Sequence, residues 1–219
     1  MARKRIAILI SGRGANMGSL IAAAKRPDYP AEIALVLSNR PRVGGLRRAS
    51  DEGIATVVVD HTDFGKDREA FERAVQAHLE TYGIDIVCLA GFTRLFTPSF
   101  VSRWNGRMIN IHPALLPSFK GLHTHERALA AGVKIHGATV HFVVPEVDSG
   151  PIIAQAAVPV LDDDTTDTLA ARVLAAELRI YPLALGLVAG GKSSFTSHGT
   201  VRNDTAVAPS GQLIVPDPR

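Results

Sequence analysis

The sequence RIAILISGRGAN, which runs from Arg5 to Asn16, decides the fold. Its first half is a short apolar run, and such runs are typical of strands that are buried on both faces of a parallel sheet. Gly12 and Gly14 follow at once, and apolar residues at helical spacing continue to Ala24. A strand, a glycine-rich turn and a helix in this order form the opening unit of many α/β proteins. The stretch therefore predicts an α/β fold.

Similar apolar runs recur along the rest of the chain. They predict six further strands, at residues 32–37, 56–59, 84–90, 108–112, 137–144 and 151–160. Crossover helices separate the earlier ones, and the clearest of these helices spans residues 67–82, where apolar side chains recur every three or four positions. Right-handed crossovers of this kind build a mostly parallel sheet. The last two runs flank a turn that contains Asp148 and predict a hairpin. We expect a doubly wound, Rossmann-like, mostly parallel sheet with an antiparallel C-terminal hairpin.

One domain accounts for most of the 219 residues. A long helical pattern over residues 165–189 closes it, and Gly, Ser, Pro and Asn become frequent from residue 190 onward. We therefore predict a catalytic domain over residues 1–190 and an irregular C-terminal extension over residues 191–219. Within that extension, Gln212 to Val215 adds at most one edge strand.

The composition is that of an ordinary soluble enzyme. Hydrophobic residues make up 46% and charged residues 21%, and the formal net charge is only +3 with the basic residues spread along the chain. This balance argues against disorder and against a nucleic-acid partner. The apolar run from Ile6 to Ile10 is too short for an export signal or a membrane span. Cys88 is the single cysteine, so no intrachain disulfide forms, and a reducing cytoplasm fits.

The most informative polar residues lie in the strand at residues 108–112. Asn110 and His112 project to the same face because alternate side chains of a strand share a face. The strand ends at Pro113, so both residues lie at its carboxyl end, where open α/β sheets bind their ligands. An amide and an imidazole at such an end interrupt the apolar run that a buried strand normally shows. The pair indicates a catalytic site.

The glycine-rich turn indicates an anion site. Residues Ser11 to Asn16 connect the first strand to a helix, and the free N–H groups of a helix N-terminus attract phosphate. The glycine spacing is one residue longer than the dinucleotide fingerprint, and Ser38-Asn39-Arg40 stands where an acidic ribose ligand would be expected, so NAD is disfavoured. NADP stays open because Arg40 could meet a 2′-phosphate.

The remaining histidines do not predict a metal centre. His123 and His125 are two residues apart, and side chains at that spacing do not share the face of a helix. No cysteine or histidine pattern typical of zinc accompanies them. His141 alternates with Val140 and Phe142 in an expected strand, so it is either a core histidine or a residue that orients groups of the site.

Five blocks of the sequence together resemble one family, the glycinamide ribonucleotide formyltransferases of purine synthesis, from Ile6 to about Gly190. The resembling blocks are Ile10 to Asn16, Leu89 to Arg94, Asn110 to Pro117, Gly121 to His125 and His136 to His141. In that family a formyl group passes from 10-formyltetrahydrofolate to the amine of phosphoribosylglycinamide. The resemblance implies that Asn110, His112 and Asp148 carry the catalysis. Asn110 and a protonated His112 would stabilise the oxyanion, while Asp148 would favour the charged imidazole and accept a proton.

The resemblance also implies where both substrates bind. It places the phosphate of phosphoribosylglycinamide on Gly14, Ala15 and Asn16, with Glu177 near the sugar or phosphate end. Ala15 and Leu174 replace the Ser and Gln that are usual in the family, so phosphate affinity would depend more on backbone amides. The formyl donor would bind at residues of two regions, namely Arg68, Thr93, Arg94, Leu95, Phe96 and Asn110, together with the loop of residues 144–148. We expect small-molecule partners and no metal, nucleic acid or membrane, and a homodimer stays open.

Other functions remain open at this point. Methionyl-tRNA formyltransferases and formyltetrahydrofolate hydrolases resemble the same Asn, His and Asp core, but they carry an additional domain for which the expected boundaries leave no room. An NADP-dependent oxidoreductase is the alternative from another class, and a nucleotide-binding module without turnover is a third. The pairing of Asn110 with His112 favours formyl transfer over both.

Overall fold

The computed structural model describes residues 2–195 and 201–203. Seven strands form one sheet in the order β3-β2-β1-β4-β5-β6-β7. The strands are β1 (Lys4–Ile10), β2 (Ala31–Ser38), β3 (Thr56–Val58), β4 (Ile86–Leu89), β5 (Met108–His112), β6 (Ile135–Phe142) and β7 (Ile152–Pro159). The five strands β1 to β5 pair in parallel, whereas β5–β6 and β6–β7 pair antiparallel. The predicted fold class, including the antiparallel C-terminal hairpin, is confirmed.

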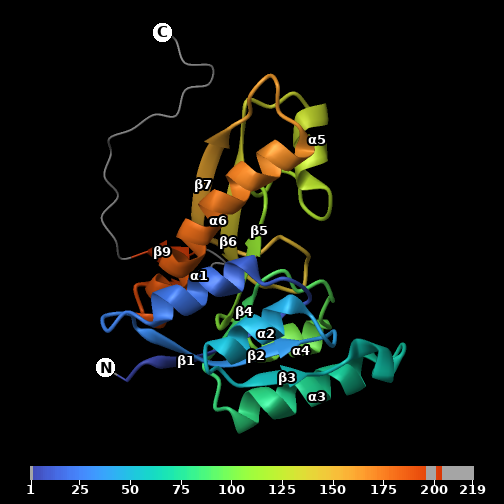
Figure 1. Cartoon of the computed structure of the whole chain (residues 1–219), viewed down its shortest axis with the longest axis vertical. Helices are drawn as coiled ribbons and strands as arrows, with labels where there is room; N and C mark the ends of the chain where they lie inside the picture. The colour runs from blue at the N-terminus through green and yellow to red at the C-terminus, as the bar shows by residue number, and fades with distance from the viewer. Residues whose placement is uncertain (1, 196–200, 204–219) are drawn as a thin grey trace.

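Helices cover both faces of the sheet (Figure 1). They are α1 (Ala15–Ala24), α2 (Gly44–Asp51), η1 (His61–Phe64), α3 (Arg68–Thr81), α4 (Pro98–Arg103), α5 (Thr124–Ala130) and α6 (Thr166–Ala189). The predicted helix over residues 67–82 corresponds to α3, whose first turn is capped by the Asp67 side chain. Among the described residues, no helix is both long enough and apolar enough to cross a membrane, and this includes α6 with its 24 residues.

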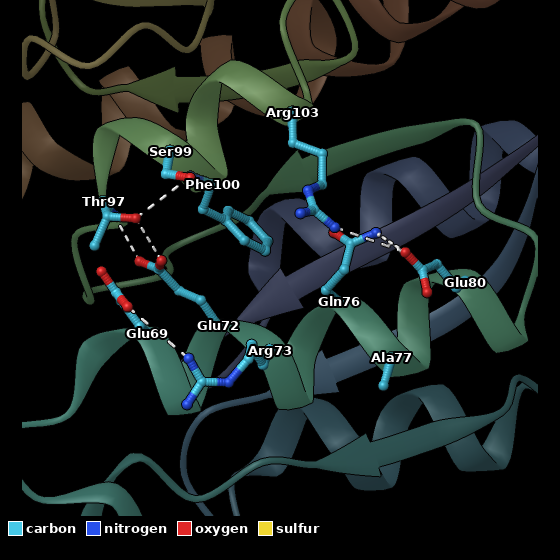
Figure 2. A pocket seen from close by; sticks show the side chains of 10 residues that line it. All are labelled: Glu69, Glu72, Arg73, Gln76, Ala77, Glu80, Thr97, Ser99, Phe100 and Arg103. Atoms are coloured by element: carbon cyan, nitrogen blue, oxygen red, sulfur yellow. Dashed lines mark hydrogen bonds and ion pairs between the residues drawn. The ribbon is translucent and has the colours of Figure 1, made fainter.

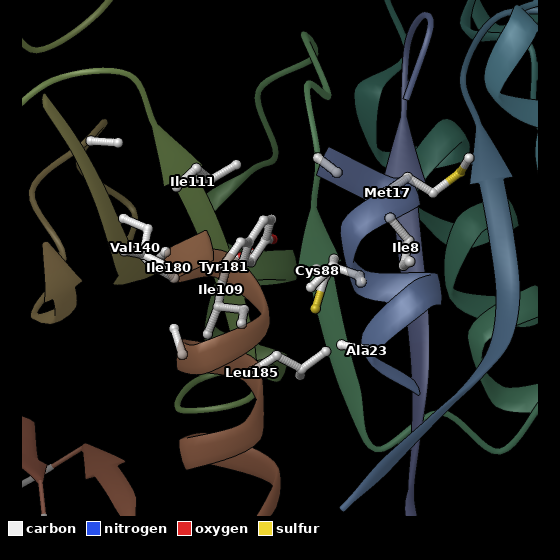
Figure 3. Close-up of a cluster of buried hydrophobic side chains, with 14 of the residues drawn as sticks. Ile8, Met17, Ala23, Cys88, Ile109, Ile111, Val140, Ile180, Tyr181 and Leu185 are labelled. Atoms are coloured by element: carbon white, nitrogen blue, oxygen red, sulfur yellow. The ribbon is translucent and has the colours of Figure 1, made fainter. Parts of the chain in front are cut away.

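The sheet has an apolar core on each face because successive side chains of β1 alternate between the two. Ile6, Ile8 and Ile10 pack beneath α1 and α6, and Ala7 and Leu9 pack against α3 and α4. Figure 3 shows the first cluster, in which Tyr181 of α6 lies over the central strands. The buried hydroxyl of Tyr181 donates to the carbonyl oxygens of Leu89 at 2.9 Å and Ile109 at 3.3 Å, so α6 is fixed to both β4 and β5.

The chain order changes direction between β1 and β4. From β1 it continues outward to β2 and β3, and from β4 it continues in the opposite direction to β5. The loops that follow β1 and β4 therefore separate at their carboxyl ends, and such a switch point is the usual place for a ligand in an open α/β sheet. Two backbone contacts mark it, because Ser11 N donates to Gly91 O at 3.2 Å and Ala90 N donates to Leu9 O.

The C-terminal extension contains regular structure that the sequence does not predict. Ser193–Phe195 (β8) and Val201–Asn203 (β9) pair as a two-stranded antiparallel sheet. Strands of three residues are too short to show an alternating pattern, which explains why the composition alone suggests an irregular segment. The boundary after residue 190 stays a prediction, and the suggested strand at Gln212 to Val215 lies outside the described residues.

Candidate active site

Asn110 and His112 lie at the carboxyl end of β5, as predicted. Leu89 of β4 is the neighbour of Asn110 on one side, and His141 of β6 is its neighbour on the other. His112 is 5% exposed, and Asn110 is half-buried. The two side chains are therefore held at the boundary between the parallel and the antiparallel part of the sheet, beside the switch point.

Asp148 reaches the same place from the turn between β6 and β7. Its Oδ2 lies 3.4 Å from Nδ1 of His112 and accepts a hydrogen bond from Gly121 N at 2.9 Å. The side chain of Asp148 is only 11% exposed. The residue has φ 49°, in the left-handed region, which Asp and Asn tolerate better than most residues. The turn thus aims the carboxylate at the imidazole, and the three predicted catalytic residues converge.

Both ring nitrogens of His112 face acceptors. Nε2 lies 3.0 Å from the carbonyl oxygen of Phe119, which can only accept, so Nε2 carries a hydrogen. Nδ1 faces the carboxylate of Asp148, which also accepts when ionised. Each ring nitrogen of His112 therefore lies beside an oxygen that can accept a hydrogen bond from it.

His141 orients the amide of Asn110. Its Nδ1 lies 2.9 Å from the carbonyl oxygen of Phe142, which assigns the ring hydrogen to Nδ1 and leaves Nε2 as an acceptor. Nε2 lies 3.2 Å from Nδ2 of Asn110, so the amide donates to the ring. Burial lowers the pKa of His141 and keeps it neutral. Of the two interpretations of His141, the one in which it orients site groups agrees with these contacts.

The glycine-rich turn and α6 meet at the predicted phosphate site. Gly14 has φ 71° and caps α1, whose first residues are Ala15 and Asn16. The amide Nδ2 of Asn16 donates to Oε2 of Glu177 at 2.6 Å. Glu177 is 7% exposed, and burial raises the pKa of its carboxyl group. The structure therefore brings together all four residues that are predicted to bind phosphoribosylglycinamide.

The loop after β4 carries Thr93, Arg94, Leu95 and Phe96, which are four of the six residues that are predicted to bind the folate. Arg68 of α3 donates to the carbonyl oxygen of Leu95 at 2.6 Å, so these two members of the set are adjacent. Phe96 stacks between Phe92 and Phe100, with ring centroids 5.2 and 4.4 Å away. The guanidinium of Arg94 instead lies 4.8 Å from the ring centroid of Phe71, so it faces the core on the α3 side.

Ser11 joins the phosphate loop to the folate loop, and sequence reasoning missed it. Its buried hydroxyl accepts from Thr93 N at 2.9 Å and donates to Oδ1 of Asn39 at 2.6 Å. A serine beside glycines looks like a turn residue in the sequence. Only the pairing of β1 with β4 shows that it lies between two loops.

The histidines that were considered as metal ligands point in different directions. His123 is exposed and lies 3.2 Å from Glu126, whereas His125 packs edge-on against His136 with ring centroids 5.4 Å apart. Within residues 2–195 and 201–203, no group of three or more His, Cys, Asp or Glu side chains could hold a metal ion.

A groove of about 330 Å³ lies between α3 and α4, on the face of the sheet that these two helices cover (Figure 2). Its wall includes Glu72, which is buried and accepts from both the backbone N–H and the hydroxyl of Thr97. None of the predicted site residues lines it. Glu72 thus fixes the end of the loop that follows β4, and the groove is separate from the predicted site.

Comparisons with known proteins identify one family. The family model described as "Formyl transferase" matches residues 4–185. The phosphoribosylglycinamide formyltransferase of Escherichia coli is 41% identical and covers 94% of this chain and 97% of its own. The crystal structure of glycinamide ribonucleotide transformylase 1 from Symbiobacterium toebii superposes with a TM-score of 0.88 at 42% identity, over 92% of this chain and 94% of that one.

A third relative is much longer than this chain. The human trifunctional purine biosynthetic protein adenosine-3 is 49% identical over 199 residues, which are 91% of this chain and 20% of that protein. The chain therefore spans about a fifth of the length of these trifunctional relatives.

The chain belongs to the formyl transferase family. The predicted resemblance to the glycinamide ribonucleotide formyltransferases is confirmed, since relatives with that name match nearly the whole chain. The predicted enzyme class, a formyltransferase of purine biosynthesis, agrees with the names of these relatives. The oxidoreductase and the nonenzymatic binding module gain nothing from these matches.

Proposed function

We propose that the protein transfers the formyl group of 10-formyltetrahydrofolate to the amine of phosphoribosylglycinamide, giving formylglycinamide ribonucleotide and tetrahydrofolate. The observation that carries the proposal is the convergence of Asn110, His112 and Asp148 beside the switch point. The predicted acceptor and donor loops lie on either side of that point and are joined through Ser11. Family membership supports the same reaction.

The three residues have complementary roles in this reaction. The amine attacks the formyl carbon and forms a new C–N bond, and the carbonyl oxygen becomes an oxyanion. The amide of Asn110 and the imidazolium of His112 donate hydrogen bonds to that oxygen as its charge develops. Asp148 keeps the imidazolium charged and accepts the proton that the attacking nitrogen loses, directly or through water. The tetrahedral intermediate then collapses, the bond from N10 of the folate to the formyl carbon breaks, and N10 takes up a proton.

The acceptor is held by its phosphate. The N-terminus of α1 offers free N–H groups at Ala15 and Asn16, and the positive end of the helix dipole favours an anion there. Ala15 has no hydroxyl to add, so backbone amides and the amide of Asn16 carry this contact. Glu177 holds the Asn16 side chain in place through the bond at 2.6 Å.

Asn16→Ala is expected to raise the KM for phosphoribosylglycinamide about tenfold and the KM for the folate less than about twofold, because Asn16 belongs to the anion site alone. Steady-state kinetics with each substrate varied in turn measures the split. Asn105→Ala is the matched control, since Asn105 is exposed just beyond α4. Equal increases in both KM values would contradict the division of the site.

The donor is bound by the loop of residues 93–96, with Arg68 placed to pair with the glutamate tail. The backbone of this loop is held by Ser11 at one end and by Glu72 at the other, so its free groups are positioned before the folate arrives.

The proposed enzyme is cytoplasmic, its partners are its small-molecule substrates, and it needs no metal. A homodimer is the one protein assembly that the proposal allows for.

The decisive experiment is an assay of formyl transfer from 10-formyltetrahydrofolate with and without phosphoribosylglycinamide. We expect tetrahydrofolate to appear only when the acceptor is present, together with the formylated acceptor in equal amount. Release of formate without acceptor would identify a hydrolase instead. Binding of both substrates without any turnover would overturn the proposal.

A further inference from the structure

Two loops meet over the carboxylate of Asp148. The first follows β5 and contains Lys120 and Gly121, and the second is the turn between β6 and β7. Gly121 N donates to the same oxygen, Oδ2, that faces His112. The distance between Asp148 and His112 therefore depends on how firmly the two loops are held together.

Lys120 connects the first loop to the second on both sides of Asp148. Its ammonium donates to the hydroxyl of Ser149 at 2.6 Å and lies 3.7 Å from Oε1 of Glu146. The Ser149 hydroxyl in turn donates to the carbonyl oxygen of Val147 at 3.0 Å. Glu146 is mostly exposed, and exposed ion pairs contribute little, so the bond to Ser149 is the stronger of the two links.

The backbone of Lys120 is held in place as well. Its carbonyl oxygen accepts from Nη1 of Arg127 at 2.6 Å, which anchors the loop to α5. On the other side, Asp148 adopts a left-handed conformation, which is unfavourable for most non-glycine residues and persists only when its surroundings hold it. A link from a fixed loop to the residue next to Asp148 supplies that restraint.

We propose that Lys120 is a positioning residue of the active site, which acts through Ser149 to hold the Asp148 carboxylate against His112. The inference rests on the proposed function, because its readout is formyl transfer. In this proposal Lys120 acts only through Ser149 and has no contact with the reacting atoms. Its loss should therefore lower the rate of the chemical step and leave the binding of both substrates nearly unchanged.

The test compares Lys120→Met with wild type in the formyl-transfer assay. Methionine keeps the apolar stem and removes the ammonium. We expect kcat to fall about tenfold, because a catalytic group displaced by less than an ångström already loses much of its effect, while both KM values change less than about twofold. Lys120→Arg should restore most of the rate.

Two further variants make the result specific. Ser149→Ala removes the other partner, and the double variant Lys120→Met/Ser149→Ala should lose no more activity than either single variant, as expected for two ends of one interaction. Lys134→Met is the matched control, because Lys134 pairs with exposed Asp162 at the opposite end of the β6–β7 hairpin. It should keep the wild-type kcat.

The outcomes separate the two proposals. Wild-type protein that transfers no formyl group would overturn the proposed function. Active wild type together with a wild-type kcat in Lys120→Met, or in Ser149→Ala if the first variant does not fold, would overturn the role of Lys120. A raised KM at unchanged kcat would overturn it too, because that pattern describes direct substrate contact.

Discussion

Asp148→Asn is expected to lower kcat about a thousandfold while the protein stays folded. Asparagine has nearly the same shape, and its oxygen can still accept from Gly121 N, as the carboxylate does at 2.9 Å. It also tolerates the left-handed conformation of residue 148. What disappears is the negative charge, which in the proposed mechanism stabilises the imidazolium of His112 and accepts the proton of the attacking amine. Single-turnover measurement of formyl transfer reports this loss without interference from product release.

Asp162→Asn is the control for this variant. The Asp162 side chain is 92% exposed and pairs with Lys134 far from the site, so the same chemical change there should leave kcat at the wild-type value. Equal thermal midpoints for the two variants would show that folding is preserved. If folded Asp148→Asn retained a rate within about threefold of wild type, the carboxylate would have no part in catalysis.

Acid should weaken the protein through His136, which is 1% exposed and packs edge-on against Phe119 and His125. Burial lowers the pKa of His136 from its ordinary value of 6.5 to about 4, and repulsion from His125 adds to this shift. The unfolded chain therefore takes up a proton at a higher pH than the folded protein does. The stabilisation is complete above pH 6.5 and is lost as the pH falls from 6.5 towards 4. From this group alone the full loss is about 3 kcal/mol.

Urea unfolding at about pH 7.5 and about pH 5 measures the effect. His136→Phe removes the titrating group, so the loss of unfolding free energy between these pH values should be smaller than in wild type by about 2 kcal/mol. His123→Gln is the control, because the His123 side chain is 68% exposed, and it should keep the wild-type slope. An unchanged slope in His136→Phe would show that another group carries the acid sensitivity.

Much of the fold could be predicted because the apolar runs record which segments are buried. The predicted strand over residues 108–112 coincides with β5, and α3 lies within one residue of its predicted bounds. The first strand was equally clear, since β1 is buried on both faces over most of its length. The strand order β3-β2-β1-β4-β5-β6-β7 was not predicted, because apolar runs do not show which strands become neighbours in the sheet.

The contacts that complete the site could not be predicted in the same way. His141 and Asn110 are 31 residues apart and meet only because β6 pairs antiparallel with β5 in one particular register. Lys120 and Ser149 meet because two loops fold over each other, and loop conformation leaves no periodic signal in a sequence. Lys120 therefore reads as an ordinary solvated lysine until the structure is known.

Cys88 offers a consequence of another kind. It is the only cysteine of the chain, it lies fully buried in β4, and burial raises the pKa of its thiol above the ordinary value. A thiol-specific reagent can therefore modify the native protein only when the centre of the sheet opens. The rate of alkylation therefore measures how often the core opens. Because each chain gains a single added mass, mass spectrometry can compare this rate among variants.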